Sequence, residues 1–304
     1  MTVEALAPAK VNLALHVTGR REDGYHLLDT IVAFGPVADR LVCERAGRLS
    51  LTITGPEAGG LDDGGENLVL RAARIIAGSS GAQITLEKHL PVASGIGGGS
   101  SDAAATLRAL SLLWDRDDEF AALNWNAPDG QIEPVVSKLL QLGADLPMCL
   151  LPRSLRARGI GERIDELDLP PLACLLANPR VPVATADVFR ALTGRGNPGL
   201  PEDLPLFDDP GDLIGWLAGQ RNDLQPAAIS VAPAIAEVLD ELRALPGCRL
   251  SRMSGSGATC FALFTDEEAA RAGGEALRQR RPGWWIAGGL LANRQRWWKP
   301  RFAP

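Results

Sequence analysis

Residues 95–101 read Gly-Ile-Gly-Gly-Gly-Ser-Ser, and the segment that follows, 101–114, is rich in Ala and Leu. Such a composition predicts a helix. Glycines leave backbone N–H groups free to converge on an anion, and a helix N-terminus adds partial positive charge. The run therefore favours a phosphate-binding loop over a flexible loop. It is not the common nucleoside-triphosphate loop, since no Gly-Lys-Ser or Gly-Lys-Thr closes it, and it is not the dinucleotide fingerprint either.

A second run rich in Gly and Ser occupies residues 254–259, Ser-Gly-Ser-Gly-Ala-Thr, just before the apolar segment 260–264. Taken alone, it is a tight connection between strands at least as often as a ligand-binding loop. Two glycine loops in separate halves of the chain, however, favour a phosphate cavity shared between two domains.

The rest of the chain mixes strand and helix patterns. Strand-like runs cover residues 10–17, 48–54 and 82–86. Helical patterns cover 68–77, ending at Gly78, and then 101–114, 134–142 and 232–245. The polar stretch 115–131 predicts a surface insertion. The pattern is α+β, and the length of 304 residues predicts two domains, 1–160 and 161–304.

The overall charge disfavours nucleic acid as a partner. The formal net charge is −6 at pH 7, whereas non-specific duplex binding needs clustered Lys and Arg. One basic segment surrounds Trp297 and Trp298, and it contains Arg294, Arg296, Lys299 and Arg301. We interpret it as a terminal strand and tail with snorkelling cations rather than a stacking or membrane-surface patch.

Cysteine usage and hydropathy bear on the cellular compartment. The five cysteines are widely scattered and have no Cys-x-x-Cys spacing, so they predict neither a disulfide framework nor a zinc site. Residues 1–8 do not resemble a signal peptide, and no apolar stretch approaches the ~20 residues needed to span a bilayer. We expect a cytoplasmic protein with no membrane contact.

Two charged residues are candidates for chemistry. Lys10 lies in an apolar strand-like segment, where a cation is costly unless it is paired or solvated. A surface-facing lysine is the simpler alternative. Asp145 lies between Gly143-Ala144 and the apolar segment 146–151, and its spacing fits a turn cap or a buried catalytic group equally well. Phosphoryl transfer to an alcohol needs such a carboxylate and cation.

Tyr25 is the only tyrosine, and it stands beside His26 directly after Gly24. The two side chains can supply a stacking face and a hydrogen-bonding edge to a heterocycle. In isolation, a packed loop anchor is the better interpretation of the pair.

Three segments, in this order, resemble the motifs of the GHMP small-molecule kinases: residues 8–13, 91–104 and 251–261. Further segments are similar to the members of that family that phosphorylate a cytidine-diphosphate-linked methylerythritol in the non-mevalonate route to isoprenoids. These segments are residues 21–26, 67–68, 143–147, 158–162 and 221–224. The resemblance covers nearly the whole chain.

The resemblance implies an α+β fold with a ribosomal-protein-S5-like N-terminal domain, a ferredoxin-like C-terminal domain and an active site between them. It implies transfer of the ATP γ-phosphate to the 2-hydroxyl of the cytidine-diphosphate-linked substrate. We expect a monomer or a weak homodimer. Mg²⁺ is expected as well, because kinase chemistry needs a divalent ion at the phosphates. The sequence does not identify its ligands.

Carried over position by position, the resemblance makes Asp145 the general base and Lys10 its cationic partner. On the substrate side it implies that Asn12 holds the substrate, that Tyr25 and Phe189 stack on cytosine, that His26 reads the polar edge of the base and that Thr185 lies nearby. The nucleotide set consists of Asn67 and Lys88 on the adenine side, then Pro91, Gly95, Gly97, Gly98, Gly99, Ser100 and Ser101. Asp102 stands where related chains can carry Asn.

Two alternatives remain open. One is another GHMP kinase of the mevalonate or homoserine type, whose acceptor offers no base for Tyr25 and Phe189 to stack on. The other is a non-catalytic nucleotide-binding or nucleic-acid-binding module, although such a module would have no need to retain both Lys10 and Asp145.

Overall fold

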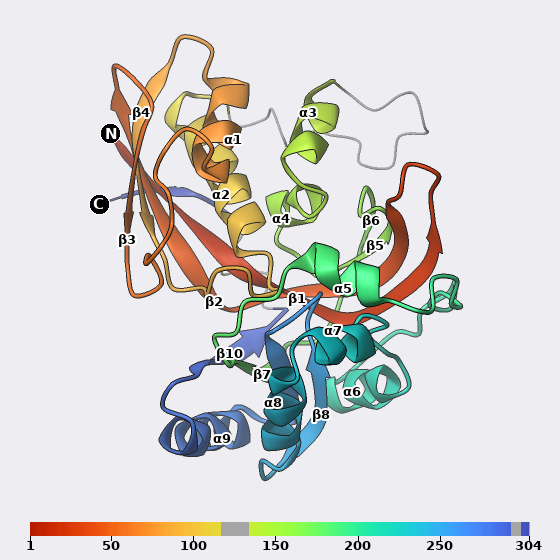
Figure 1. Cartoon of the computed structure of the whole chain (residues 1–304). Coiled ribbons are helices and arrows are strands. Elements are labelled where there is room, and N and C mark those ends of the chain that lie inside the picture. Colours follow the sequence, from red (N-terminus) through yellow and green to blue (C-terminus); the bar gives the residue numbers. More distant parts are fainter. Residues whose placement is uncertain (117–133, 293–298, 304) are drawn as a thin grey trace.

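The computed structural model describes residues 1–116, 134–292 and 299–303, and the chain folds into two sheets, each covered by helices (Figure 1). The first sheet is built on a long antiparallel pair, β1 (Thr2–Arg20) and β2 (His26–Ala46). Its other strands are β3 (Ser50–Thr54), β4 (Gly81–Glu87), β5 (Leu155–Gly159), β6 (Arg163–Glu166) and β11 (Arg301–Phe302).

Helices cover one face of this first sheet, and their apolar sides share one core with it. They are α1 (Leu68–Ala77), α2 (Gly98–Leu113), α3 (Pro134–Leu142) and α4 (Leu146–Leu150). The Asn67 side chain caps α1 by accepting from the Val69 N–H, and the helix ends at Gly78. Nearly every side chain of α2 from Ser101 to Leu113 is buried, so the helix runs through the interior between α1, α4 and the sheet.

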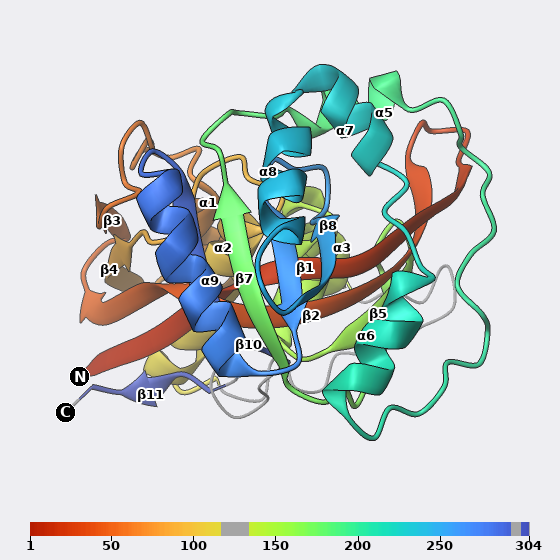
Figure 2. The ribbon, with the colours of Figure 1, turned by 90° about the horizontal axis from the view of Figure 1, so that it is seen from below.

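The second sheet is antiparallel, in the order β10 (Trp285–Leu291), β7 (Leu172–Asn178), β9 (Cys260–Phe264) and β8 (Cys248–Met253). On one face it carries α8 (Ala234–Arg243) and α9 (Glu267–Arg280), as Figure 2 shows. Its other face packs against residues of β1 and β2. The remaining helices are α5 (Thr185–Ala191), α6 (Pro210–Ala218) and α7 (Gln225–Val231).

The predicted α+β class is confirmed, and several elements are confirmed at or near their predicted bounds. The helices α1 and α3 match the predicted ranges, whereas α2 starts at Gly98, three residues before the predicted start at Ser101. The strand predicted at 10–17 is the middle of the much longer β1. Its extra length comes from pairing with β2, which local patterns do not reveal.

Some predictions fall outside the described residues. Most of the predicted insertion at 115–131 and most of the basic tail, including Trp297 and Trp298, belong to that part of the chain. The predicted domain boundary near residue 160 falls in the β5–β6 hairpin of the first sheet, and the second sheet begins with β7. Within the described ranges, no helix has the length and hydropathy to cross a bilayer.

Candidate active site

The glycine run forms the N-terminus of α2. Gly97 is the N-cap residue in the left-handed conformation, with φ 66°, and no side chain caps the helix. The Ser101 N–H donates to the Gly97 carbonyl at 2.8 Å, and the N–H groups of residues 98–100 precede the first helical bond. These N–H groups and the positive end of the helix together make an anion site at the start of α2.

The second glycine run packs directly on the first. The Ser254 hydroxyl donates to the Gly95 carbonyl at 3.2 Å, and the Thr259 N–H donates to the Ser94 carbonyl at 3.1 Å. A Cβ on Gly95 would lie 2.6 Å from the Gly257 carbonyl oxygen, so this approach requires glycine. The two runs, which are far apart in sequence, therefore line one cavity, as their sequences predicted.

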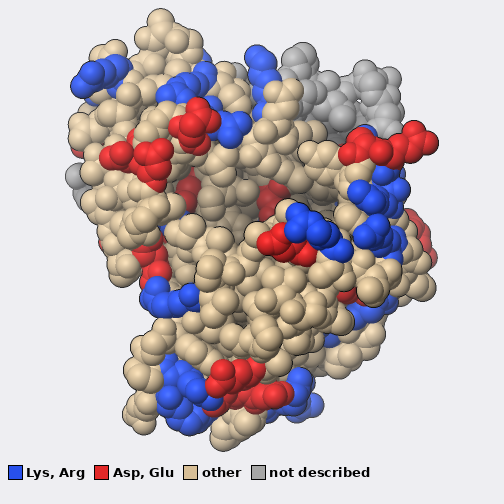
Figure 3. Space-filling model, in the orientation of Figure 1, with Lys and Arg blue, Asp and Glu red and all other residues tan. Residues whose placement is uncertain are grey.

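We call this space the loop cavity, a hollow of about 670 Å³ between the two sheet-and-helix halves. Figure 3 shows the molecule hollowed on this face, with carboxylate-bearing residues visible inside the hollow. The predicted site residues that line it are Lys10, Asn12, Asn67, Lys88, Pro91, Gly95, Gly97, Gly98, Gly99, Ser100, Asp145, Thr185 and Phe189.

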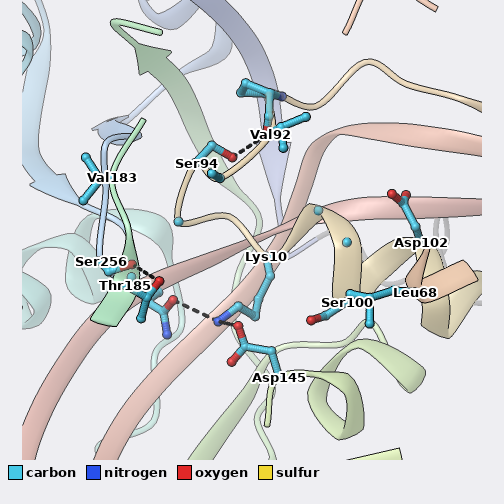
Figure 4. A pocket seen from close by; sticks show the side chains of 18 of the residues that line it. Lys10, Leu68, Val92, Ser94, Ser100, Asp102, Asp145, Val183, Thr185 and Ser256 are labelled. Carbon is cyan, nitrogen blue, oxygen red and sulfur yellow. Dashed lines mark hydrogen bonds and ion pairs between the residues drawn. The ribbon is translucent and has the colours of Figure 1, made fainter. Parts of the chain in front are cut away.

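Lys10 and Asp145 point toward one another inside the loop cavity (Figure 4). Lys10 Nζ lies 3.0 Å from Asp145 Oδ2 and donates to Asn12 Oδ1 at 3.2 Å. The Asn12 amide is held in turn by the Thr30 hydroxyl, to which it donates at 2.8 Å. Lys10 is buried, so the surface-facing alternative is wrong.

Asp145 is the N-cap residue of α4, yet its side chain makes no capping hydrogen bond. Its carboxylate instead pairs with Lys10 and is partly exposed to the cavity rather than buried, as the catalytic alternative had assumed. The turn-cap interpretation is therefore wrong for this side chain. What remains is a carboxyl group that is anchored by a buried lysine and open to a ligand, which is the arrangement that a general base needs.

Lys88 is committed to two buried carboxylates. Its ammonium group donates to Asp39, and to Asp102 Oδ2 at 2.7 Å. Burial alone would lower the pKa of Lys88, but the two carboxylates outweigh it and raise that pKa. Burial, together with the repulsion from Asp39, raises the pKa of Asp102 well above its ordinary value, against the attraction of Lys88. Lys88 thus lines the loop cavity, while its charge is already balanced.

A second hollow, which we call the aromatic cavity, has a volume of about 790 Å³. It is lined by Tyr25, His26 and Phe189, three of the predicted substrate residues. His26 and Phe189 stack on each other, with ring centroids 4.6 Å apart, whereas the Tyr25 side chain is exposed. Burial, and then the charges of Arg20 and Arg195, lower the pKa of His26. The neutral imidazole is therefore the dominant form near neutral pH.

The two cavities meet, and the residues they share are Leu28, Ser100, Asp145, Thr185 and Phe189. The Thr185 hydroxyl lies 2.9 Å from that of Ser256 and joins α5 to the second glycine loop. A molecule filling the aromatic cavity can thus present a group to Asp145, while a second molecule occupies the loop cavity.

Ser101 differs from its neighbours in the predicted nucleotide set. Its hydroxyl donates to the Pro8 carbonyl of β1 at 2.6 Å, and it does not line the loop cavity. Its N–H is also engaged, by the Gly97 carbonyl, because α2 begins earlier than predicted. Neither group is therefore free to bind a ligand. Its role here is to hold the start of α2 against β1.

Sequence reasoning missed several residues that shape the site. The Asn222 amide donates at 2.8 Å to the carbonyls of both Met253 and Gly255, and so fixes the second glycine loop. Asp39 accepts from Lys88 and from the Leu90 N–H. The sequence could have pointed to Asp39, because a carboxylate there interrupts a largely apolar, strand-like stretch. Asn222 offered no such clue beyond its place in the 221–224 segment.

Family comparisons match both halves of the chain. The GHMP kinases N terminal domain matches residues 67–151, and the GHMP kinases C terminal family matches residues 203–282. Among solved structures, that of homoserine kinase from Cytophaga hutchinsonii superposes with a TM-score of 0.62 at 19% identity, which bears on the fold alone; the alignment covers 99% of this chain and 96% of that one.

Relatives with higher identity carry one shared name, 4-diphosphocytidyl-2-C-methyl-D-erythritol kinase. The protein of that name from Cereibacter sphaeroides is 53% identical over 95% of this chain and 99% of its own length. The one from Ruegeria pomeroyi is 49% identical over 96% of this chain and 100% of its own. A crystal structure of 4-(cytidine 5'-diphospho)-2C-methyl-D-erythritol kinase superposes with a TM-score of 0.71 at 39% identity, covering 95% of this chain and 99% of that one. This chain therefore belongs to the GHMP kinases and, among them, to the family of 4-diphosphocytidyl-2-C-methyl-D-erythritol kinases.

Proposed function

We propose that this chain transfers the γ-phosphate of ATP to the 2-hydroxyl of 4-diphosphocytidyl-2-C-methyl-D-erythritol, in the non-mevalonate route to isoprenoid precursors. One observation carries the proposal: the loop cavity and the aromatic cavity share Asp145, which is paired with the buried Lys10. A phosphate donor in the first cavity and an alcohol in the second would meet at this carboxylate.

In this mechanism Asp145 accepts the proton of the attacking hydroxyl, and Lys10 stabilises the negative charge that develops around it. The free N–H groups of residues 98–100 hold the ATP phosphates at the positive end of α2. Asn12 accepts a hydrogen bond from Lys10 and so keeps Lys10 directed at Asp145. It also lines the same cavity, where it helps to hold the substrate. Little else is required of the protein, because phosphoryl transfer depends mainly on positioning and charge stabilisation.

Mg²⁺ fits the site through the phosphates rather than through a protein cage. The described residues contain no group of three or more His, Cys, Asp or Glu side chains placed to hold a metal ion. The side-chain oxygen ligands that the shared wall offers are the Ser100 and Thr185 hydroxyls and the Asp145 carboxylate. Mg²⁺ commonly keeps several waters and binds through one or two such groups plus substrate phosphates. When bound, it would neutralise charge on the ATP phosphates.

The base-binding roles rest on the aromatic cavity. Tyr25 and Phe189 are proposed to stack on cytosine, and His26 is proposed to read its polar edge from the neutral form. Since His26 now stacks on Phe189, cytosine would have to take the place of one ring. The nearby Thr185 lies on the wall that both cavities share. On the ATP side, Asn67, Lys88 and Pro91 are proposed to border adenine.

The alternatives are less well supported. An acceptor of the mevalonate or homoserine type would leave the aromatic cavity without a ligand for its rings. A non-catalytic module would not need a buried lysine directed at an accessible carboxylate. We also propose a domain boundary near residue 160, a monomer or weak homodimer, a cytoplasmic location and no nucleic-acid partner, the last from the net charge of −6.

The test is a phosphorylation assay with Mg²⁺-ATP and each acceptor in turn: the cytidine-diphosphate-linked methylerythritol, mevalonate and homoserine. The product would be located by phosphorus NMR, which distinguishes a new phosphate on the 2-hydroxyl from one elsewhere. We expect turnover of the cytidine substrate alone. Turnover of mevalonate or homoserine, with none of the cytidine substrate, would contradict the proposal.

A further inference from the structure

The aromatic cavity contains cations whose charges are not balanced by the protein. Its two carboxylates are both paired: Asp23 with Arg21 at 2.8 Å and Asp145 with Lys10 at 3.0 Å. Neither carboxylate therefore balances the charge of another cation in this cavity. Three arginines also line this cavity: Arg20, Arg190 and Arg195.

These three guanidinium groups differ in their partners. Arg190 pairs with Asp187, one turn earlier on α5. Arg20 and Arg195 have no carboxylate within ion-pair distance among the residues that the structure describes. Each is instead tied to a backbone carbonyl through Nε only: Arg20 to Gly24 at 3.2 Å and Arg195 to Leu192 at 3.4 Å. The Nη groups of both side chains are thus left for a ligand.

Arg20 and Arg195 come from separate parts of the chain but line one cavity. Arg20 is the last residue of β1, and Arg195 lies in the connection after α5. Both cations lower the pKa of His26, which agrees with their facing the same imidazole. The two arginines therefore lie near the imidazole of His26 in the aromatic cavity.

We propose that Arg20 and Arg195 together bind the diphosphate of the acceptor substrate. This inference rests on the proposed function, because the diphosphate is the link between the cytidine and the sugar alcohol. With the base at His26 and Phe189 and the hydroxyl at Asp145, that link must cross the aromatic cavity. Guanidinium groups are well suited to bind a diphosphate, since two N–H groups of one guanidinium can donate to two phosphate oxygens at once. Their Nε bonds to backbone carbonyls hold the forks in place before the ligand arrives.

The experiment compares Arg20→Gln, Arg195→Gln and the double variant with wild type, and uses Arg271→Gln as the control. Arg271 is an exposed arginine of α9 that is paired with Glu275 and lines neither the loop cavity nor the aromatic cavity. Calorimetry would measure the dissociation constants of CDP and of cytidine, which lacks phosphate. Steady-state kinetics would give KM for the acceptor and for ATP.

We expect each single variant to weaken CDP binding and to raise the acceptor KM by about tenfold, the effect of losing one hydrogen-bonded charge contact. The double variant should lose more of its CDP affinity than either single variant. Cytidine binding and the ATP KM should stay within twofold of wild type in all three. The control variant should match wild type throughout. Unchanged CDP binding in the double variant would overturn the inference while leaving the proposed function intact.

Two further outcomes separate the possibilities. If wild type bound neither CDP nor cytidine, the proposed function itself would fail, and the inference with it. Equal losses for CDP and cytidine would also overturn the inference, because they would indicate general damage to the cavity. NMR titration of His26 supplies a readout that does not depend on substrate: its pKa should rise in both single variants, because each removes a cation that lowers it.

Discussion

Lys10 Nζ lies 3.0 Å from Asp145 Oδ2, yet the Lys10 side chain is 5% exposed and the Asp145 side chain 41%. The pair is thus asymmetric: the cation is fixed inside the protein, and the anion borders two cavities. An ion pair formed only for stability would have no reason to keep its carboxylate open to a ligand. The asymmetry is what a proton acceptor requires, because the acceptor must touch the hydroxyl while its partner stays in place.

Replacing Asp145 with Asn should lower kcat by at least ~100-fold, since the amide cannot accept the hydroxyl proton. ATP affinity should change little, because the phosphate-binding N–H groups belong to α2. Pre-steady-state kinetics and a fluorescent ATP analogue would measure the two quantities. Asp240→Asn, in an exposed ion pair on α8, is the control and should behave as wild type. Near-normal turnover by the Asp145 variant would remove the role assigned to this carboxylate.

The contact between the two glycine loops predicts an effect on stability. Gly95 has φ 76°, and a Cβ there would lie 2.6 Å from the Gly257 carbonyl oxygen. Gly95→Ala should therefore reduce the free energy of unfolding by about 1–3 kcal/mol and weaken ATP binding, because the loops must separate. Urea unfolding and ATP titration would measure both. Gly59→Ala is the control, since no atom lies within 4 Å of its added Cβ. Equal free energies of unfolding for the two variants would contradict the prediction, because they would mean that the two loops can move apart at little cost.

Local signals were sufficient for some elements of this fold. Both ends of α1 could be predicted, because Asn67 and Gly78 act on the backbone within a few residues. The length of β1 could not be predicted in this way. It is set by pairing with β2 along nearly the whole strand, which includes segments with no clear alternation.

The site shows the same division between local and distant causes. The glycine run predicted uncapped N–H groups at the start of a helix, since the glycines and the helix are contiguous in sequence. The spacing around Asp145 left its role open, because its partner Lys10 is 135 residues away. Arg20 and Arg195 carried no signal, since nothing in sequence shows whether an arginine has a carboxylate near it. Only the family resemblance connected such distant positions.

A buried ion pair between the neighbouring strands β2 and β5 of the first sheet supplies a further prediction. Arg156 of β5 binds both carboxylate oxygens of Asp29, at 2.9 and 2.8 Å, and also donates to the Pro201 carbonyl. Arg156→Met should lower the free energy of unfolding by about 3–5 kcal/mol, because Asp29 would remain buried without its partner. Arg158→Met is the matched control on the same strand, since the ion pairs of Arg158 are more exposed and should contribute under ~1 kcal/mol. Similar losses in both variants, measured by urea unfolding, would contradict this distinction.

His16 predicts how stability changes with pH. Its side chain is buried, and Nδ1 lies 3.2 Å from the Pro198 carbonyl. Burial, and then the charge of Arg221, lower the pKa of His16 below its ordinary value of 6.5. Between that value and the lowered one, the unfolded chain binds a proton that the folded protein does not. The free energy of unfolding should therefore fall as the pH drops below about 6.5, and the loss should end once the pH is below the folded pKa.

His16→Asn keeps a group able to bond with the Pro198 carbonyl but cannot titrate. We expect this variant to be less stable than wild type at pH 7.5, because it leaves space where the ring was. Its free energy of unfolding should nevertheless decline less steeply between pH 7 and 5. Urea unfolding at half-unit intervals would measure both slopes, and NMR would follow His16 directly in wild type. Because other groups, including His26, titrate in both proteins, the difference between the slopes isolates His16; parallel curves would mean that burial does not keep this imidazole neutral.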